Sequence, residues 1–370
     1  MTPLYLNPVL LRMWSCGFRL RHAVRRRSRA ARIITAKRTA FYAQIWREAA
    51  ERCGATVVEN ADHSFEIRDG NRALNVNCNT TDLDSVETLE FAGNKPAVHR
   101  LLSREGLPTP RFLQFGLASL PSALEFLQSV RELPGAACVV KPARDTGSGH
   151  GVTTGITSPF ELAWAVAAAL PLGDDLLIEQ QITGENYRLL YLNGGLVDVV
   201  RRSPPQVAGD GRSNVSDLLD RLNAERIAQG TGEAQVLVTR TFDLRRTLAR
   251  QGLRLDSVPP VGSRVILKTV INENSSADNE SVRDQVCDAI VDAGKRAVSL
   301  VGAALAGVDV VTTDISRPLS ETGGVILEVN TTPGFHYHYH NRSNRCAVAE
   351  VVLNAALRPR EVVRDLEYVI

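Results

Sequence analysis

Hydrophobic positions divide the chain into alternating helical and extended segments. Apolar residues recur at helical spacing in residues 41–53 and 95–105, and each segment ends at a glycine, Gly54 or Gly106, which suits a left-handed helix C-cap. Shorter apolar or β-branched runs predict strands at 56–59, 64–68, 73–76, 138–141, 176–182, 265–270, 307–312 and 325–329. Further helices are expected at 160–170, 215–229 and 347–357. This alternation of strands, helices and Gly-rich turns predicts an α/β architecture.

Charge is distributed unevenly along the 370 residues. The formal net charge is +2, but residues 1–47 hold 11 of the 43 basic residues and no acid precedes Glu48. The remaining 32 basic residues face 41 acidic ones, so no general nucleic-acid-binding surface is expected on the body of the protein. Three interpretations of the N-terminal segment stay open: a solvated extension, a lid or subunit contact, and a transit peptide or polyanion-binding arm.

Composition narrows the class of protein. Hydrophobic residues make up 44% of the chain and charged residues 23%, which is typical of a soluble globular protein with a full core. The six cysteines are scattered singly without a CxxC pair, so we expect reduced thiols and no zinc site. No apolar run approaches the roughly 20 residues that span a bilayer. A cytoplasmic protein without a membrane segment is the expectation.

A Gly-rich stretch at residues 145–151 follows the strand that ends at Lys141. Ser148, Gly149 and Gly151 would let backbone N–H groups approach a polyphosphate, and a lysine at the strand end adds a positive charge. A flexible surface hairpin is the alternative.

The segment 176–188 places polar residues at the end of an apolar strand. Glu179 and the residues that follow it could hydrogen-bond an adenine edge and a ribose. A solvated strand end is the alternative.

Three oxygen-bearing side chains stand on apolar strands near the C-terminus. Period-two alternation puts Glu328 and Asn330 on one face of a strand, and the preceding strand adds Asp309. Two carboxylates and an amide oxygen are ligands suited to Mg²⁺. A structural ion pair with an arginine or lysine is the alternative.

His336, His338 and His340 alternate just after these strands. In an extended segment they would share one face. A wall that shapes the substrate pocket, a solvated loop or subunit contact, and a second metal site all remain open.

Taken together, the motifs resemble the ATP-grasp carboxylate-amine ligases, and among them the ATP-grasp portion of the cyanophycin synthetases. The matching stretches are residues 140–142, 145–151, 178–188, 307–311 and 328–334, and the resemblance covers about residues 93–357. The cyanophycin synthetases carry a second ATP-using domain, for which this sequence shows no second nucleotide motif. The resemblance implies an ATP-grasp fold of two α+β lobes, preceded here by a small N-terminal α/β domain.

The resemblance also implies a role for each matching position. Lys95 and Lys141 would bind the nucleotide phosphates together with Ser148, Gly149 and Gly151. The remaining matches are Glu179 and Ile182 for adenine, Asn186 or its neighbour Glu185 for ribose, Arg188, Arg202 and Lys268 for phosphate or acylphosphate charge, and Asp309, Glu328 and Asn330 for Mg²⁺. The implied cofactors are ATP and two Mg²⁺ ions.

This alignment of motifs predicts four segments along the chain. They are the Arg-rich extension 1–40, a small α/β domain 41–92, a nucleotide-binding lobe 93–182, and a catalytic lobe 183–370 with an insertion at about 203–262. A homo-oligomer is expected by analogy with the family alone.

The expected activity is ATP-dependent formation of an amide or peptide bond between an amino-acid-derived carboxylate and an amine through an acylphosphate. Dipeptide synthesis like that of glutathione synthetase or D-alanine:D-alanine ligase is an alternative on the same core. A nucleotide-responsive binding protein with a polyanion-binding arm is the alternative from another class.

Overall fold

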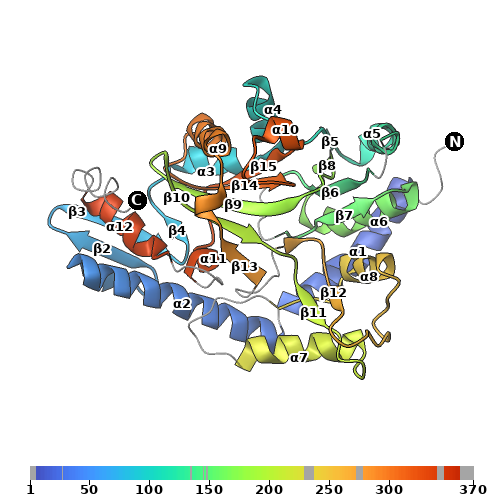
Figure 1. Cartoon of the computed structure of the whole chain (residues 1–370), viewed down its shortest axis with the longest axis horizontal. Coiled ribbons are helices and arrows are strands. Elements are labelled where there is room, and N and C mark those ends of the chain that lie inside the picture. Colours follow the sequence, from blue (N-terminus) through green and yellow to red (C-terminus); the bar gives the residue numbers. More distant parts are fainter. Residues whose placement is uncertain are drawn as a thin grey trace.

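In the part of the chain that the structure describes, four antiparallel sheets and the helices around them form a mixed α/β structure, which confirms the predicted fold class (Figure 1). The computed structural model describes residues 6–26, 28–133, 136–144, 146, 149–228, 237–271, 278–339 and 346–358. Short 3-10 turns at Leu117–Ser119, Leu170–Leu172 and Arg283–Gln285 and the helix α10 (Leu319–Thr322) connect larger elements. No helix among the described residues is long and apolar enough to cross a membrane.

The first sheet is the small one near the N-terminus. Its order is β1-β2-β3-β4, with strands Thr56–Glu59, Phe65–Asp69, Arg72–Asn77 and Thr80–Thr81. Helices α2 (Arg29–Cys53) and α12 (Val348–Leu357) pack against each other and share a hydrophobic core with this sheet. The expected glycine cap is present, because Gly54 ends α2 with a φ of 66°. Helix α2, however, begins well before residue 41 and continues through the boundary expected at residue 40.

The second sheet has the order β5-β8-β6-β7. Its strands are β5 (Phe112–Phe115), β6 (Cys138–Pro142), β7 (Thr153–Ile156) and β8 (Leu176–Gln180). Helices α5 (Leu120–Arg131) and α6 (Pro159–Ala169) pack on it and close a core of Leu, Val, Ile and Ala side chains. Pairing of β6 with β8 sets Val139 opposite Glu179 and Lys141 opposite Leu177.

The third and largest sheet has the order β13-β10-β9-β14-β15. Its strands are β9 (Glu185–Leu192), β10 (Gly195–Arg202), β13 (Asn279–Ser281), β14 (Leu305–Thr312) and β15 (Val325–Asn330), and helices α3 (Val86–Gly93), α4 (Lys95–Arg104) and α9 (Asp288–Val301) contribute to its core. The strand expected at 176–182 ends at Gln180, and the next strand, β9, belongs to a different sheet. The chain passes from one sheet to the other between Gln180 and Glu185.

The insertion predicted at about 203–262 contains a small unit with its own core. Strands β11 (Gln206–Ala208) and β12 (Arg264–Ile266) pair with each other, and helices α7 (Val215–Ala228) and α8 (Phe242–Arg250) pack beside them. The strand expected at 265–270 is shorter than predicted, because β12 ends at Ile266.

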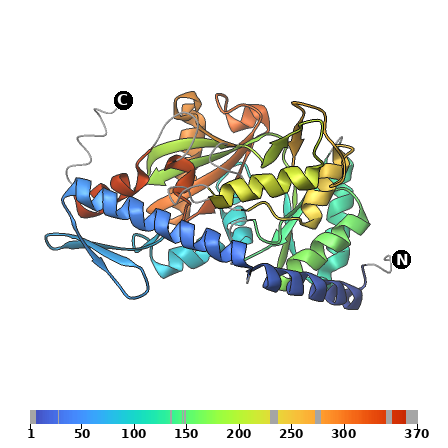
Figure 2. The same ribbon diagram turned by 90° about the horizontal axis from the view of Figure 1, so that it is seen from below.

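Helix α1 (Pro8–Arg26) differs from a solvated extension. Leu6 and Leu11 are 1% and 0% exposed within the core of the second sheet, and the Trp14 ring stacks on Trp164 of α6 at 5.3 Å. Helices α1 and α2 follow each other along one side of the molecule, with α7 beside α2 (Figure 2). Among the described residues, α1 therefore packs on the body of the protein, and a lid or subunit contact stays a prediction.

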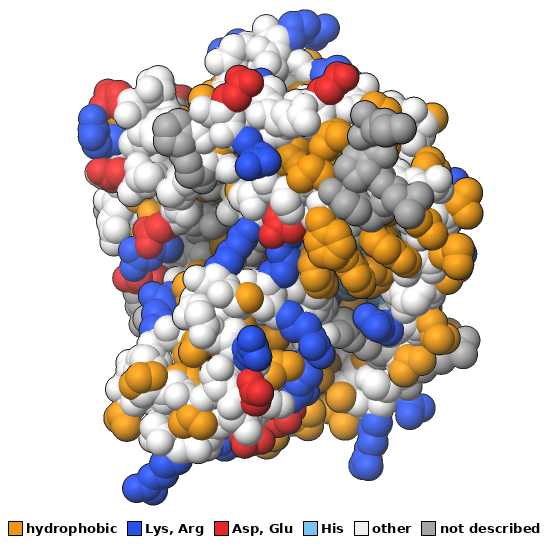
Figure 3. Space-filling model, turned by 90° about the vertical axis from the view of Figure 1, so that its right-hand side faces the viewer, with side chains coloured by type: hydrophobic (Ala, Val, Ile, Leu, Met, Phe, Trp, Pro, Cys, Tyr) orange, Lys and Arg blue, Asp and Glu red, His pale blue; other side chains and the backbone are white. Residues whose placement is uncertain are grey.

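The sequence of helix α6 indicates that another element must pack on it. It reads PFELAWAVAAA, so it has almost no polar face, and an all-round apolar helix must be covered on every side. The sheet covers one side of α6, and α1 covers another. On the side of the molecule where α1 lies, hydrophobic side chains gather next to Lys and Arg side chains (Figure 3). On α1 itself, Val9, Met13, Leu20 and Val24 are exposed.

We expect Leu11→Ala to lower the free energy of unfolding by about 2–4 kcal/mol, because it removes a fully buried side chain and leaves a cavity beside α6. The matched control is Leu20→Ala on the same helix, where the leucine is 67% exposed and the expected change is within about 0.5 kcal/mol. Denaturant unfolding measures both. Equal stabilities for the two variants would show that α1 is not part of the folded core.

Candidate active site

A cavity of about 390 Å³ is lined by residues from the second and third sheets. It gathers most of the predicted site residues, namely Lys95, Lys141, Gly149, Glu179, Ile182, Asn186, Arg188, Arg202, Asp309, Glu328 and Asn330. Gly151, Glu185 and Lys268 do not line it, and Ser148 lies outside the described residues. Residues separated by up to 235 positions in the sequence therefore meet at one place.

Lys141 and Glu179 form a buried pair on neighbouring strands β6 and β8. Lys141 Nζ donates to Glu179 Oε1 at 2.9 Å, and both side chains are at most 7% exposed. Burial raises the pKa of Glu179, and the charge of Lys141 opposes that rise. Glu179 Oε2 has no hydrogen-bond partner among the described residues, although His99 Nε2 lies 3.7 Å away. Burial and the nearby charges of Lys141 and Lys95 lower the pKa of His99 to about 3, so its ring is neutral.

Lys95 connects the Gly-rich loop to the third sheet. Its Nζ donates to the Thr146 carbonyl at 2.8 Å and lies 3.5 Å from Glu328 Oε1. Gly149 and Gly151 have φ angles of 64° and 73°, and a Cβ at Gly151 would meet Leu172 at 2.8 Å. Other residues would strain the backbone at both positions. The glycines therefore let the loop turn close to the strand that carries Lys141.

Arg188 and Asp309 form a bidentate ion pair across strands β9 and β14, where they are register partners. Arg188 Nε and one terminal nitrogen donate to the two oxygens of Asp309 at 2.5 and 2.8 Å, and Arg202 lies 3.6 Å from the same carboxylate. A Cβ on Gly307 would lie 2.7 Å from Arg188 Cδ, so the glycine makes room for the arginine. Burial would raise the pKa of Asp309, but the charges of Arg188 and Arg202 outweigh it and hold the pKa below its ordinary value.

The three predicted metal ligands lie together at one edge of this site. Asp309 and Glu328 are paired residues of β14 and β15, and Asn330 Nδ2 donates to Asp309 Oδ2 at 3.2 Å. Both Asp309 oxygens also accept from Arg188, so the ion pair expected as the alternative is present at this residue. No three His, Cys, Asp or Glu side chains gather as a metal-binding group within the described part of the chain. The oxygen set of two carboxylates and one amide still fits the ligand chemistry of Mg²⁺.

Several predicted residues point elsewhere. Glu185 accepts from the Tyr187 hydroxyl at 2.8 Å and lies 3.5 Å from Arg201, outside the cavity. Arg201 also pairs with Glu280 on β13, whereas its neighbour Arg202 lines the cavity, as alternation along a strand requires. Lys268 Nζ donates to Thr239 Oγ1 at 2.9 Å in the insertion, although the adjacent Thr269 lines the cavity.

Among the cavity residues that the sequence analysis did not predict as site residues are Arg38, Asn79, Thr154 and Thr269. Arg38 lies within the arginine run of the N-terminal segment, and Asn79 lies in the turn between β3 and β4 of the small sheet. Neither belongs to a motif, so only the packing of α2 and β3 against the main body brings them to the site. Tyr337 also lines the cavity, and Arg202 donates to its hydroxyl at 3.0 Å and lies 4.2 Å from its ring.

The expectation that His336, His338 and His340 share one face of an extended segment is wrong for the described residues. His336–Tyr339 form a short helix, α11, which places His336 in the cavity wall and turns His338 away from it. His338 Nδ1 lies 2.7 Å from Asp198 Oδ2 and its side chain is fully buried. His340 lies outside the described residues. The period-two pattern misled because the chain turns after Phe335.

We expect Asp198→Asn to lower the free energy of unfolding at pH 7 by on the order of 2 kcal/mol, because Asp198 bonds the buried His338 and Ser281 as a carboxylate. Burial opposes ionisation, but the bonds to His338 and Ser281 lower the pKa of Asp198 below its ordinary 3.8. Its contribution is therefore complete above about pH 4 and is lost as the pH falls through the lower folded pKa. Urea unfolding at pH 7 and pH 3 should show a steeper loss for the wild type than for the variant. The exposed control Asp256→Asn should follow the wild type.

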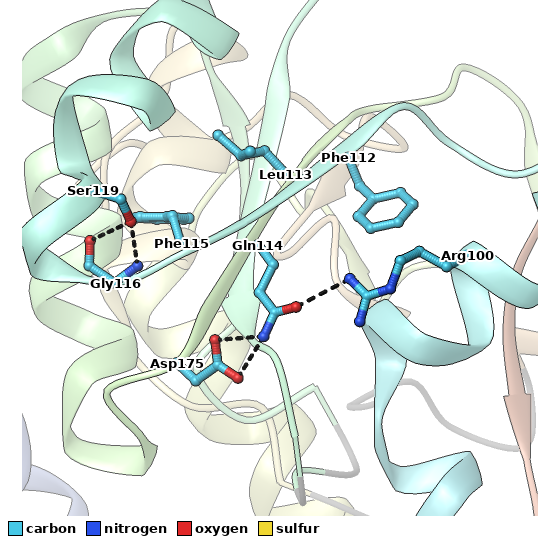
Figure 4. A pocket seen from close by; sticks show the side chains of 8 residues that line it. All are labelled: Arg100, Phe112, Leu113, Gln114, Phe115, Gly116, Ser119 and Asp175. Atoms are coloured by element: carbon cyan, nitrogen blue, oxygen red, sulfur yellow. Dashed lines mark hydrogen bonds between the residues drawn. The ribbon is translucent and has the colours of Figure 1, made fainter.

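A second hollow lies beside the edge strand β5 and contains none of the predicted site residues (Figure 4). Arg100 donates to Gln114 at 3.1 Å, and Gln114 donates to both oxygens of Asp175 at 3.0 and 2.9 Å. The polar side chains of this hollow thus bond to one another. Its described lining lacks the set of lysines, arginines and oxygen ligands that lines the 390 Å³ cavity.

Comparisons with known proteins place the chain among related sequences and folds. No protein-family model matches the chain. The chain is 36% identical over 264 residues to the cyanophycin synthetase of Nostoc sp., a match that covers 70% of this chain and 28% of that protein. It is 28% identical over 294 residues to the bifunctional glutathione biosynthesis protein of Desulfotalea psychrophila, covering 75% of this chain and 37% of that protein. The fold matches the bifunctional glutathione synthetase of Pasteurella multocida with a TM-score of 0.52, 23% identity and coverage of 82% and 41% of the two chains.

The chain belongs to the ATP-grasp ligase superfamily. Its curated ATP-grasp relatives are enzymes, and the chain spans only about 28% of the length of the cyanophycin synthetases that it matches. The similarity therefore concerns the ATP-grasp portion, and the activities of the whole relatives are not transferred with it.

Proposed function

We propose that the chain is an ATP-dependent ligase that joins an amino-acid-derived carboxylate to an amine. The reaction would proceed through an acylphosphate and release ADP and phosphate. The observation that carries this proposal is the 390 Å³ cavity, in which lysines near the second sheet face arginines and oxygen ligands of the third sheet. Phosphoryl transfer requires mainly positioning and charge neutralisation, which such a cavity supplies without a protein nucleophile.

In this proposal the nucleotide lies along β6 and β8. Lys95 and Lys141 place positive charge beside the glycines of the loop, where the phosphates would sit. Glu179 Oε2 is an acceptor without a donor among the described residues, and Ile182 and Asn186 line the adjoining wall, so these three residues would face the adenosine.

Asp309, Glu328 and Asn330 would hold magnesium, as one or two ions. Bound there, Mg²⁺ would neutralise phosphate charge as a Lewis acid. The chain's own part is to keep the three oxygen ligands on adjacent strands and to fix Asp309 through Arg188.

Arg188 and Arg202 would stabilise the negative charge of the transferring phosphoryl group and of the acylphosphate. Both are buried, a guanidinium keeps its positive charge in proteins, and Arg202 is oriented by its hydrogen bond to the Tyr337 hydroxyl. Lys268 would add positive charge from the insertion after exchanging its bond with Thr239 for one with phosphate.

The test is Mg²⁺-dependent ADP release by the purified protein with pools of amino acids and short peptides, with and without hydroxylamine. We expect ADP release that depends on a carboxylate pool, together with trapped hydroxamate. If no pool gives ADP while Mg-ATP still raises the melting temperature, the protein binds nucleotide without ligating these substrates, and the ligase proposal is contradicted for them.

A further inference from the structure

The charges that line the cavity do not balance. The described lining contains five Lys or Arg side chains, Arg38, Lys95, Lys141, Arg188 and Arg202, against three acids, Glu179, Asp309 and Glu328. Lys141 pairs with Glu179, Lys95 with Glu328, and Arg188 and Arg202 share Asp309. Of the five, Arg38 alone has no carboxylate within 4.0 Å among the described residues.

We propose that Arg38, together with Asn79, forms a subsite that binds a carboxylate of one substrate, separate from the carboxylate that reacts. The proposal rests on the ligase function proposed above and adds a binding group from outside the ATP-grasp motifs. An arginine offers planar paired donors that match a carboxylate, which a lysine does not.

Arg38 is held in place by a rigid part of the fold. One turn further along α2, the Tyr42 ring lies 5.8 Å from the Arg38 guanidinium, and the Tyr42 hydroxyl accepts the backbone N–H of Phe335 at 3.1 Å. Tyr42 and Trp46 are fully buried in the core of the small sheet. The helix therefore presents Arg38 from a fixed position, which limits the entropy lost when a ligand binds.

Asn79 orients the Arg38 guanidinium and connects it by hydrogen bonds to the end of the cavity where the proposed metal ligands lie. One terminal nitrogen of Arg38 donates to Asn79 Oδ1 at 3.0 Å, and Asn79 Nδ2 donates to the Thr332 carbonyl at 2.8 Å. Thr332 follows Asn330 by two residues, so the relay ends beside the proposed metal ligands. Among the described residues no further hydrogen bond of the Arg38 guanidinium is found, so its other N–H groups can face a ligand in the cavity.

Two further groups at this end of the cavity favour an anion. Arg202 is 8% exposed, and its Nε has no hydrogen-bond partner among the described residues. Burial, with Arg38 and Arg202 nearby, lowers the pKa of His336 well below its ordinary value, so His336 adds no charge of its own. An incoming carboxylate would therefore meet unmatched donors at this end, whereas Lys95 and Lys141 are bound to Thr146 and Glu179.

The test compares free acids with their amides. Binding of the twenty standard amino acids and a dipeptide panel, each as free acid and as C-terminal amide, is measured by melting-temperature titration with Mg²⁺ and a non-hydrolysable ATP analogue. The variants are Arg38→Ala and Arg38→Gln, the second of which retains a donor for Asn79 in case the first fails to fold. The matched control is Arg32→Gln, an exposed position on the same helix.

We expect at least one free acid to bind the wild type and Arg32→Gln at least tenfold more tightly than its amide. In the Arg38 variants the acid should lose roughly ten- to a hundredfold in affinity while the amide is unchanged, the range of a hydrogen bond to a charged group. The subsite is refuted if no acid is preferred by the wild type, or if the preference survives in Arg38→Gln.

Failure of the subsite and failure of the ligase proposal are distinguishable. ADP release with hydroxamate trapping in the wild type judges the ligase, and the acid-to-amide preference judges Arg38. An active ligase whose preference ignores Arg38 removes only the subsite, and an Arg38-dependent preference without ADP release removes only the ligase.

Discussion

Glu328→Gln is expected to lower ADP release by a factor on the order of 10² or more while the protein stays folded. Glu328 sits opposite Asp309 in the β14–β15 register, lines the cavity and lies 3.5 Å from Lys95 Nζ. The substitution keeps the shape of the side chain and removes one negative charge from the proposed ligand set. Steady-state turnover over a range of Mg²⁺ concentrations measures the effect, and Asn330→Ala is expected to behave in the same way.

The control is Glu321→Gln on α10, a half-exposed glutamate of the same lobe that pairs with Arg317. It should retain turnover, because a surface pair contributes little and lies away from the cavity. If Glu328→Gln and Glu321→Gln both keep the melting temperature of the wild type, the loss of turnover in Glu328→Gln is a loss of catalysis and not of folding. Near-normal turnover in both Glu328→Gln and Asn330→Ala would remove the metal assignment.

The sequence was sufficient for the part of the site that is built on strands. Alternation placed Glu328 and Asn330 on one face, and the structure pairs that strand with Asp309 because β14 and β15 are neighbours. The lysines and glycines around the Gly-rich loop could likewise be predicted from the sequence, since the positive φ angles at Gly149 and Gly151 follow from the turn that the loop makes. Local pattern and side-chain chemistry agree at these positions.

The sequence was insufficient wherever a distant packing contact decides the outcome. Arg38 looked like one arginine in a basic run, and only the burial of Tyr42 and Trp46 against the small sheet brings it to the cavity. The same holds for α1, whose place follows from the apolar surface of α6. The sequence from His336 to Tyr339 alternates with the period of a strand. These residues nevertheless form a helix, in which the buried His338 bonds Asp198. Periodicity over so few residues cannot separate the two.

Arg188→Met is expected to lower the free energy of unfolding by about 3–5 kcal/mol, because it leaves the buried Asp309 carboxylate without its bidentate partner. Methionine fills much of the space of the arginine stem, so the loss reports the charge and not a cavity. Arg202, at 3.6 Å, and Asn330 compensate only in part. Denaturant unfolding of the wild type and the variant measures the difference.

Two further variants separate the ion pair from general damage to the sheet. Arg201→Met on β10 removes an arginine whose partner Glu280 is one third exposed, so the expected cost is below about 1 kcal/mol. Adding Asp309→Asn to Arg188→Met should restore most of the lost stability, since the unpaired charge is gone, but should not restore ADP release. If Arg188→Met alone were as stable as the wild type, the Arg188–Asp309 ion pair would not contribute to the stability of the fold. If the double variant recovered turnover, Asp309 and Arg188 would have a structural role only, and neither would be needed for phosphoryl transfer.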